Sequence, residues 1–410
     1  MGEAIAASGL ALVEHTFELP LDHQDESGPQ ITVFAREVAD PERRDRPFLV
    51  YLQGGPGFEA PRPTRNPGAP GWLDYALSEF RVLMLDQRGT GRSTPIGTLG
   101  GLTPAQQAEY LSHFRADSIV RDAEAIRRVL GVEEWSVLGQ SFGGFCVTSY
   151  LSLAPEGLRE ALITGGVPPL GRHADEVYAQ TYSRVLERNR RYFARYLQDR
   201  ARLSAVRRRL EDQEVRLPGG DRLTWRRFQQ LGSMLGMSDG AERLHYILEL
   251  PHDSPAFLHD VENATSFARN PIYAILHEAS YADGVPTRWS AHRMLPDEFV
   301  TDDLLIGEHV FPWMFEDYGA LAPLREAADL LAEREWGPLY DAAALGANEV
   351  PAAAAIYAED MYVEREFSEL TAREIRGLRS WVTNEYEHNG LRVDGERILG
   401  RLLDLARGRA

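Results

Sequence analysis

The chain has 410 residues, of which 43% are hydrophobic and 26% charged, and its formal net charge is −18. This charge disfavours nucleic acids and anionic membranes as partners, because both would repel the protein. The single cysteine, Cys146, excludes an intramolecular disulfide and a zinc site built from cysteines. Residues 1–8 lack the features of a signal peptide, and no apolar run approaches the ~20 residues of a membrane span, so we expect a cytoplasmic protein.

The first 170 residues predict strands that alternate with helices. Residues 10–19 and 31–38 alternate loosely between apolar and polar side chains and predict a β-hairpin at the edge of a sheet. Short apolar runs predict further strands at residues 48–52 and 80–85, from residue 135 onward, and at 161–164. Apolar residues at helical spacing predict a helix over 118–130, and a second helix is expected to run to about residue 153. This alternation indicates βαβ units and a mostly parallel sheet.

The pattern changes after residue 169. Residues 178–210 form a long, arginine-rich helical stretch, and helical patterns continue beyond it. The interleaved acidic residues indicate that the arginine-rich face is a solvated helix surface. Strands are predicted again at 350–358 and 378–382, followed by a helix over 395–406. We therefore expect a core in two parts, residues 1–170 and 346–410, with a helical cap inserted at residues 171–345.

A Gly-x-Ser-x-Gly pattern stands at residues 139–143, after the strand that begins at residue 135. It is typical of a nucleophile elbow, in which a strand turns sharply into a helix with serine at the apex. A side chain at Gly139 or Gly143 would clash where strand and helix pass closely. The helix would direct its amide groups and positive dipole end at an oxyanion beside Ser141. The alternative is a glycine-rich turn whose serine has no chemical role.

The chain order selects partners for Ser141. In hydrolases with this elbow the catalytic residues follow the order Ser, Asp or Glu, His. Of the 11 histidines only His388 lies beyond the last predicted strand, and Asp360 follows the strand before it. Glu359 is the alternative acid, although the shorter aspartate is the usual orienting partner. Taken singly, His388 fits a surface histidine and Asp360 a strand-capping acid, but their joint order and placement favour a catalytic triad.

This triad predicts acyl transfer. His388 would take the hydroxyl proton of Ser141 and return it to the leaving group, while Asp360 would hold the imidazole tautomer. The N–H of Phe142 would supply one oxyanion donor. We expect the second from the loop after residues 48–52, at Gly55, where the absence of a Cβ lets the backbone approach the substrate.

Three motifs resemble the proline iminopeptidase (prolyl aminopeptidase) branch of the α/β hydrolases. They are Gln-Gly-Gly-Pro-Gly at 53–57, Asp-Gln-Arg-Gly-Thr-Gly-Arg-Ser at 86–93 and Gly-Gln-Ser-Phe-Gly-Gly at 139–144. The resemblance runs from residue 48 to the end and is looser through the helical insertion. It implies a serine exopeptidase that removes an N-terminal proline, or another small apolar residue, without metal or other cofactor. Gln53 departs from the family, whose loop begins with histidine, and we expect it to alter how the loop is tied down.

An aminopeptidase must also hold the α-ammonium group of its substrate, and a buried cation requires carboxylates. In the family these are glutamates of the helical cap. The stretch 271–281 resembles the family segment that carries one of them, which implies Glu278, and Glu308 is a candidate for the second. The alternative for each is a surface glutamate, which is common in a chain with 62 acidic residues.

We therefore expect an α/β-hydrolase fold whose mostly parallel sheet is flanked by helices, with the cap inserted before the acid-bearing strand. The expected activity is that of a serine aminopeptidase on short peptides with a free N-terminus, since folded proteins would not fit beneath a cap. Two alternatives stay open: an esterase or amidase whose substrates lack a free amine, and a non-catalytic binding protein on the same scaffold. The sequence gives no indication of the oligomeric state.

Overall fold

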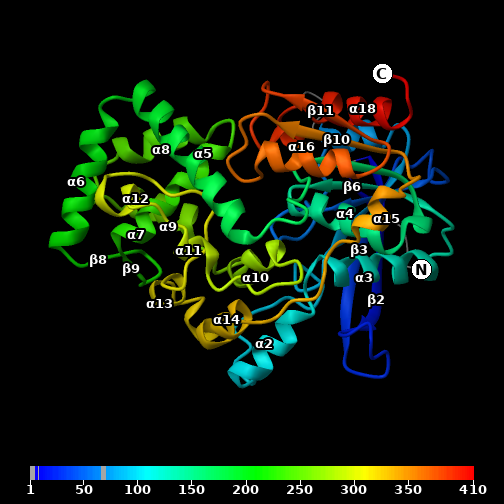
Figure 1. The fold of residues 1–410 in the computed structure, drawn as a ribbon, viewed down its shortest axis with the longest axis horizontal. Coiled ribbons are helices and arrows are strands. Elements are labelled where there is room, and N and C mark those ends of the chain that lie inside the picture. The colour runs from blue at the N-terminus through cyan, green and yellow to red at the C-terminus, as the bar shows by residue number, and fades with distance from the viewer. Residues whose placement is uncertain (1–4, 8, 66–70) are drawn as a thin grey trace.

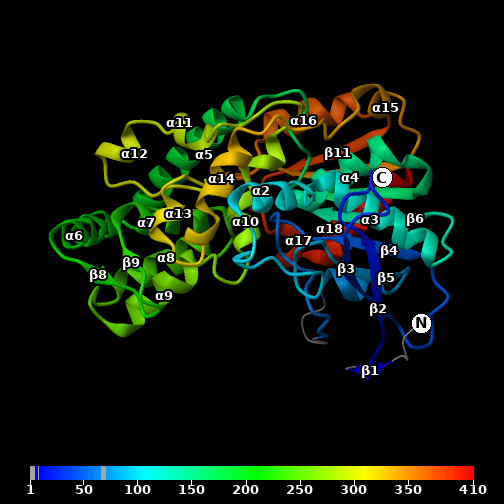
Figure 2. The ribbon, with the colours of Figure 1, turned by 90° about the horizontal axis from the view of Figure 1, so that it is seen from below.

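The structure is a computed structural model that describes residues 5–7, 9–65 and 71–410. The N-terminal segment for which no signal peptide is expected lies mostly outside these residues. The chain forms two lobes, one built around a β-sheet and one built from helices (Figure 1). A view turned by 90° shows the same two lobes side by side (Figure 2). No helix in the described part of the chain has both the length and the apolar character needed to cross a bilayer.

Nine strands form one sheet in the order β1-β2-β3-β5-β4-β6-β7-β10-β11. The strands are β1 (Ile5–Ala7), β2 (Leu10–Pro20), β3 (Gln30–Ala39), β4 (Phe48–Leu52), β5 (Arg81–Asp86), β6 (Trp135–Gln140), β7 (Leu158–Thr164), β10 (Ala352–Tyr357) and β11 (Leu378–Thr383). From β5 to β11 every neighbouring pair is parallel, whereas β1, β2 and β3 join antiparallel. The mostly parallel sheet is confirmed, and the predicted hairpin is β2–β3, with β1 outside it at the edge.

Helices cover both faces of the sheet, which explains the uninterrupted apolar runs of its central strands. Along β4, Phe48 and Val50 pack into one core with helices α3 and α4, while Leu49 and Tyr51 pack into a second core with α1 and α18. The helices of this lobe are α1 (Trp72–Ala76), α3 (Ala116–Val129), α4 (Phe142–Leu153), η1 (Pro155–Gly157), α16 (Arg365–Glu374), α17 (Gly390–Val393) and α18 (Gly395–Ala406). Helix α2 (Pro104–Ser112) packs mainly against the helix at Arg325–Ala332.

Between β7 and β10 the chain is mainly helical. It forms α5 (Ala174–Arg195), α6 (Asp199–Asp212), β8 (Val215–Arg216), β9 (Arg222–Leu223), α7 (Trp225–Gln229), η2 (Gln230–Gly236), α8 (Gly240–Glu249), α9 (Pro255–Thr265), α10 (Pro271–Leu276), η3 (Glu278–Tyr281), α11 (Ser290–Arg293), α12 (Glu298–Thr301), α13 (Met314–Asp317), η4 (Ala322–Leu324), α14 (Arg325–Ala332) and α15 (Ala342–Gly346). Most of these elements make up the second lobe, whereas α15 returns to the sheet and packs against α4.

The helical stretch predicted over 178–210 consists of two helices, because the chain leaves the helical conformation at Tyr196 and begins α6 at Asp199. The break places the fully buried Asp199 in a polar cluster. Its Oδ2 accepts a hydrogen bond from the Tyr192 hydroxyl at 2.5 Å and lies 2.8 Å from His245 Nδ1. A continuous helix would not bring this carboxylate to His245, which belongs to α8.

Candidate active site

Ser141 stands at the apex of a sharp turn between β6 and α4. Its backbone has φ 56° and ψ −126°, a strained conformation for a residue with a side chain. Its N–H donates to the carbonyl of Thr164 on the neighbouring strand at 3.0 Å. A Cβ at Gly139 would lie 2.2 Å from the carbonyl oxygen of Gly143, and a Cβ at Gly143 would lie 1.9 Å from that of Leu52. The two glycines are therefore required by the close passage of helix and strand, as the elbow pattern predicts.

The acid and the histidine meet at the ends of β10 and β11. Asp360 Oδ2 lies 2.6 Å from His388 Nδ1, and both residues are buried. The other carboxylate oxygen of Asp360 accepts hydrogen bonds from the N–H groups of Tyr362 at 2.8 Å and Val363 at 3.2 Å. These amides fix the carboxylate, so its second oxygen is directed at the imidazole.

Glu359, the alternative acid, points elsewhere. Its carboxylate forms an ion pair with Arg191 and is 43% exposed. The side chain that the structure joins to His388 is therefore Asp360.

Two consecutive glycines separate the elbow from the histidine. A Cβ at Gly166 would lie 3.0 Å from the Cα of Ser141, and one at Gly165 would lie 3.4 Å from His388 Nδ1. Serine and histidine thus lie on either side of one short turn. Among the residues that the structure describes, the Ser141 hydroxyl is not hydrogen bonded to His388, so that bond stays a prediction.

The surroundings of His388 favour its protonated form. Burial by itself lowers the pKa of His388, but the charge and the hydrogen bond of Asp360, together with the charge of Glu308, outweigh it and raise the pKa above its ordinary value. A histidine that gains a stabilised positive charge when it takes a proton is suited to act as a general base.

The glycine loop after β4 lies directly against the nucleophile. A Cβ at Gly54 would lie 2.8 Å from the Cβ of Ser141, so only glycine allows this approach. Gly55 follows with φ +129°, and Phe142 is the first residue of α4. The side-chain oxygen of Gln53 accepts a hydrogen bond from the Tyr51 hydroxyl at 2.7 Å. Its main-chain carbonyl accepts one from the Gln87 side chain at 3.0 Å.

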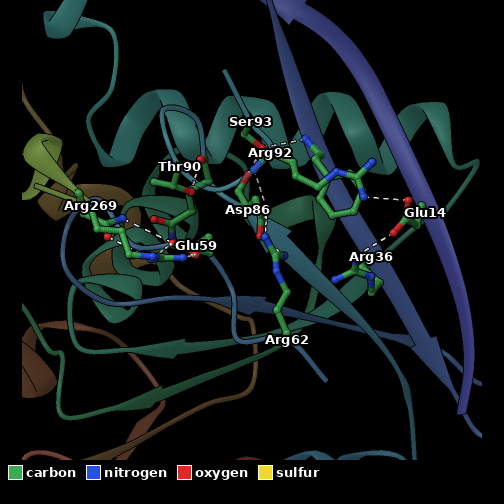
Figure 3. A network of polar contacts seen from close by, with 12 residues as sticks. Glu14, Arg36, Glu59, Arg62, Asp86, Thr90, Arg92, Ser93 and Arg269 are labelled. Carbon is green, nitrogen blue, oxygen red and sulfur yellow. Dashed lines mark hydrogen bonds and ion pairs between the residues drawn. The ribbon is translucent and has the colours of Figure 1, made fainter. Parts of the chain in front are cut away.

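The helical lobe holds the far end of this loop. The side chain of Asn270 donates to the carbonyl of Gly57 at 2.8 Å, and Arg269 pairs with Glu59. Figure 3 shows Arg269 directed at Glu59, beside a second network in which Arg62 donates to both carboxylate oxygens of Asp86 at 2.9 Å. The segment 86–93 thus helps to fix the loop structure.

Glu278 is the first residue of η3 and is buried, and its carboxylate lies against the first turn of α11. Its Oε1 accepts a hydrogen bond from the N–H of Ala291 at 2.9 Å, while its Oε2 has no partner among the described residues. Burial raises the pKa of this carboxyl. The hydroxyl of Tyr178 is also buried without a partner among the described residues, and burial together with the charges of Glu278 and Glu308 raises the Tyr178 pKa. Unpartnered buried polar atoms are rare and call for a ligand or water.

Glu308 lines a cavity of about 410 Å³ beside the triad. It accepts a hydrogen bond from the Tyr273 hydroxyl, and its Oε2 lies 3.7 Å from His277 Nε2. Burial alone would raise the pKa of Glu308, but the contacts with His277 and Tyr273 hold it below its usual value. Tyr362, another lining residue, packs edge-on against the His388 ring at 4.7 Å. Glu308 is therefore a charged carboxylate that faces open space near the histidine.

Aromatic residues join the elbow to the helical lobe, a contact that the sequence does not locate. Phe145 on α4 contacts Tyr281, which in turn contacts Tyr178, each pair with ring centroids 5.7 Å apart. They come from segments far apart in the chain and share no motif, so only the tertiary structure brings them together. Within residues 5–7, 9–65 and 71–410, no group of three or more His, Cys, Asp or Glu side chains is arranged to hold a metal ion.

Comparison with known proteins agrees with this geometry. A family profile described as alpha/beta hydrolase fold matches residues 47–276. A proline iminopeptidase of Aeromonas sobria is 52% identical over 97% of both chains. The chain belongs to the proline iminopeptidase family of the α/β hydrolases. A second member, proline iminopeptidase aneH of Aspergillus aculeatus, is 36% identical over 97% of this chain and 94% of its own.

Among solved structures, a 2-hydroxy-6-oxo-6-phenylhexa-2,4-dienoate hydrolase from Rhodococcus aligns over 97% of this chain and 99% of its own. The TM-score is 0.46 and the sequence identity 14%. The family predicted from the sequence is confirmed by the full-length relatives.

Proposed function

We propose that this protein is a cytoplasmic serine aminopeptidase that releases N-terminal proline, or another small apolar residue, from short peptides. The observation that carries the proposal is the buried pair of Asp360 and His388, which lies next to the strained Ser141. The charge of the Glu308 carboxylate also acts on His388 and helps to raise its pKa. The two full-length relatives, both proline iminopeptidases, support the substrate class.

The reaction would proceed through an acyl-enzyme. Ser141 attacks the first peptide carbonyl while His388 takes its proton, and Asp360 stabilises the imidazolium. The N–H groups of Phe142 and Gly55 would donate to the oxyanion, with the dipole of α4 adding to their effect. His388 then protonates the leaving amine, and a water molecule activated by the same histidine releases the free amino acid.

Glu278 and Glu308 would hold the substrate ammonium group. Glu278 supports this role because its Oε2 lacks a partner, and Glu308 because its carboxylate keeps a low pKa at the cavity wall. An ammonium group between two carboxylates gains charge-assisted hydrogen bonds that offset its desolvation. We further propose that residues 171–345 act as a cap that admits peptides and excludes folded proteins.

Hydrolysis of prolyl-naphthylamide and N-acetylprolyl-naphthylamide tests this proposal. We expect the wild type to cleave the first and not the second, and Ser141→Ala to cleave neither. Equal rates on both substrates would show that no free amine is required and would favour an esterase or amidase. Failure of a fluorophosphonate probe to label Ser141 in the folded protein would favour a non-catalytic binding protein.

A further inference from the structure

Helix α5 of the helical lobe contacts the two loops that carry Asp360 and His388. Three of its arginines, Arg184, Arg188 and Arg191, lie at positions i, i+4 and i+7, on one face of the helix. The sequence predicts a solvated surface here, and for Arg188 this is wrong, because its side chain is only 12% exposed.

Arg188 is bonded to both loops at once. Its Nη1 donates to Glu387 Oε1 at 2.8 Å, and its Nη2 donates to the other carboxylate oxygen of Glu387. The same Nη2 donates to the carbonyl oxygen of Glu359 at 2.6 Å. Glu387 immediately precedes His388, and Glu359 immediately precedes Asp360. One planar guanidinium therefore joins the backbone next to the acid with the side chain next to the histidine.

The other two arginines of this face each reach one loop only. Arg184 donates to both carboxylate oxygens of Glu364 at 2.7 and 2.8 Å. Arg191 pairs with the side chains of Glu359 and Glu187, and among the described residues it has no hydrogen bond or ion pair next to His388. They hold α5 against the sheet lobe without linking the acid to the histidine.

We propose that Arg188 is a positioning residue, which fixes the separation of the Asp360 and His388 loops and so makes the triad depend on the docking of α5. The proposal rests on the proposed function in that Ser141, Asp360 and His388 are the reacting groups. It does not depend on which amino acid is released.

The chemistry of the arginine side chain suits this role. Its donors are held in a rigid fork, so it can bind a carboxylate through two bonds and a carbonyl through a third without losing geometry. A lysine ammonium at the same place keeps the charge but cannot span both partners. Because a displacement of about 1 Å costs on the order of 10²-fold in rate, a loosened loop is enough to impair His388.

The test compares Arg188→Met with Arg184→Met and Arg191→Met, which remove an arginine from the same helix face. The rate of fluorophosphonate labelling of Ser141 and the kcat for prolyl-naphthylamide are measured for each. We expect Arg188→Met to lower both by about 10- to 100-fold with little change in KM, and the two controls to stay close to the wild type. Arg188→Lys should recover part of the loss.

The pH dependence of labelling separates positioning from simple docking. Asp360 and Glu308 raise the pKa of His388, and Arg188→Met alone would also leave the Glu387 charge unpaired beside the histidine. The profile is therefore read in the double variant Arg188→Met with Glu387→Gln, in which a loosened Asp360–His388 pair should move the acid limb to lower pH, whereas the controls should leave it unchanged. A cavity of about 280 Å³ lies beside the contact, so water can reach the groups that Arg188→Met leaves unpaired. If the unpaired Glu387 prevents folding, the variant Arg188→Met with Glu387→Gln removes both charges and should show the same slow labelling.

Wild-type rates in Arg188→Met, or equal losses in Arg188→Met and Arg184→Met without a shift of the acid limb in the double variant, would overturn the proposal. A wild type that labels with fluorophosphonate but leaves prolyl-naphthylamide intact would overturn only the proposed substrate. A wild type that neither labels nor hydrolyses would overturn both.

Discussion

Replacing Asp360 with asparagine alters one atom of the site and leaves its hydrogen-bonded frame in place. The retained oxygen can still accept from Tyr362 and Val363, so the new amide group takes the position 2.6 Å from His388 Nδ1. Two N–H donors cannot face each other there, and the imidazole is forced into the tautomer whose Nε2 carries the proton. In that state His388 cannot accept the proton of Ser141.

The expected cost is large. In serine hydrolases with this triad the wrong tautomer lowers kcat by about 10⁴-fold. At about 1.36 kcal/mol for each factor of ten, this corresponds to about 5.5 kcal/mol of lost transition-state stabilisation. The assay is kcat for prolyl-naphthylamide, with thermal unfolding measured on the same sample to show that the variant is folded.

Glu359→Gln is the matched control, because this neighbouring carboxylate is 43% exposed and pairs with Arg191 instead of His388. We expect it to keep nearly all activity. A folded Asp360→Asn variant that loses less than about tenfold in kcat would refute the assignment of Asp360 as the orienting acid.

Three further predictions follow from the described contacts. Glu278→Gln and Glu308→Gln should each lower kcat/KM for prolyl-naphthylamide by about 10- to 100-fold, since charged hydrogen bonds contribute about 1.5–3 kcal/mol; an unchanged value would remove that residue from the amine site. The kcat/KM of the wild type should rise with pH through an apparent pKa above 6.5, because the neutral form of His388 is the base and its pKa is raised; an acid limb below 6.5 would contradict this. Gly143→Ala should lower the free energy of unfolding in urea by about 1–3 kcal/mol or more, since the new Cβ would lie 1.9 Å from a carbonyl oxygen of β4. Gly97→Ala, with no atom within 4 Å of the new Cβ, is its control, and equal stability of the two variants would contradict the steric argument.

The sequence predicts those parts of the fold that depend on local or steric rules. Strands β4 and β10 are apolar along their whole length because parallel strands between two layers of helices are buried on both faces. The elbow is predictable because only glycine fits at Gly139 and Gly143. The order of Ser141, Asp360 and His388 along the chain follows from the order of the strands that carry them.

Features that depend on distant contacts are not predictable in this way. The break between α5 and α6 follows from the burial of Asp199 against His245, which belongs to a different helix. In the sequence the arginines of α5 resemble a solvated face, because the partner of Arg188, Glu387, lies 199 positions away along the chain. The contact of Phe145 with the helical lobe likewise requires Tyr281 and Tyr178, whose approach is set by the packing of that lobe.

Peptide mass spectrometry of the enzyme quenched during turnover tests the central claim most directly. The enzyme is mixed with a proline ester, quenched in acid within the first turnovers, digested and mapped. The account predicts an added mass of one prolyl group on the peptide that contains Ser141, absent in Ser141→Ala and lost from the wild type as substrate is consumed. Turnover by the wild type without such an adduct, turnover by Ser141→Ala, or a prolyl group on any other residue would contradict it.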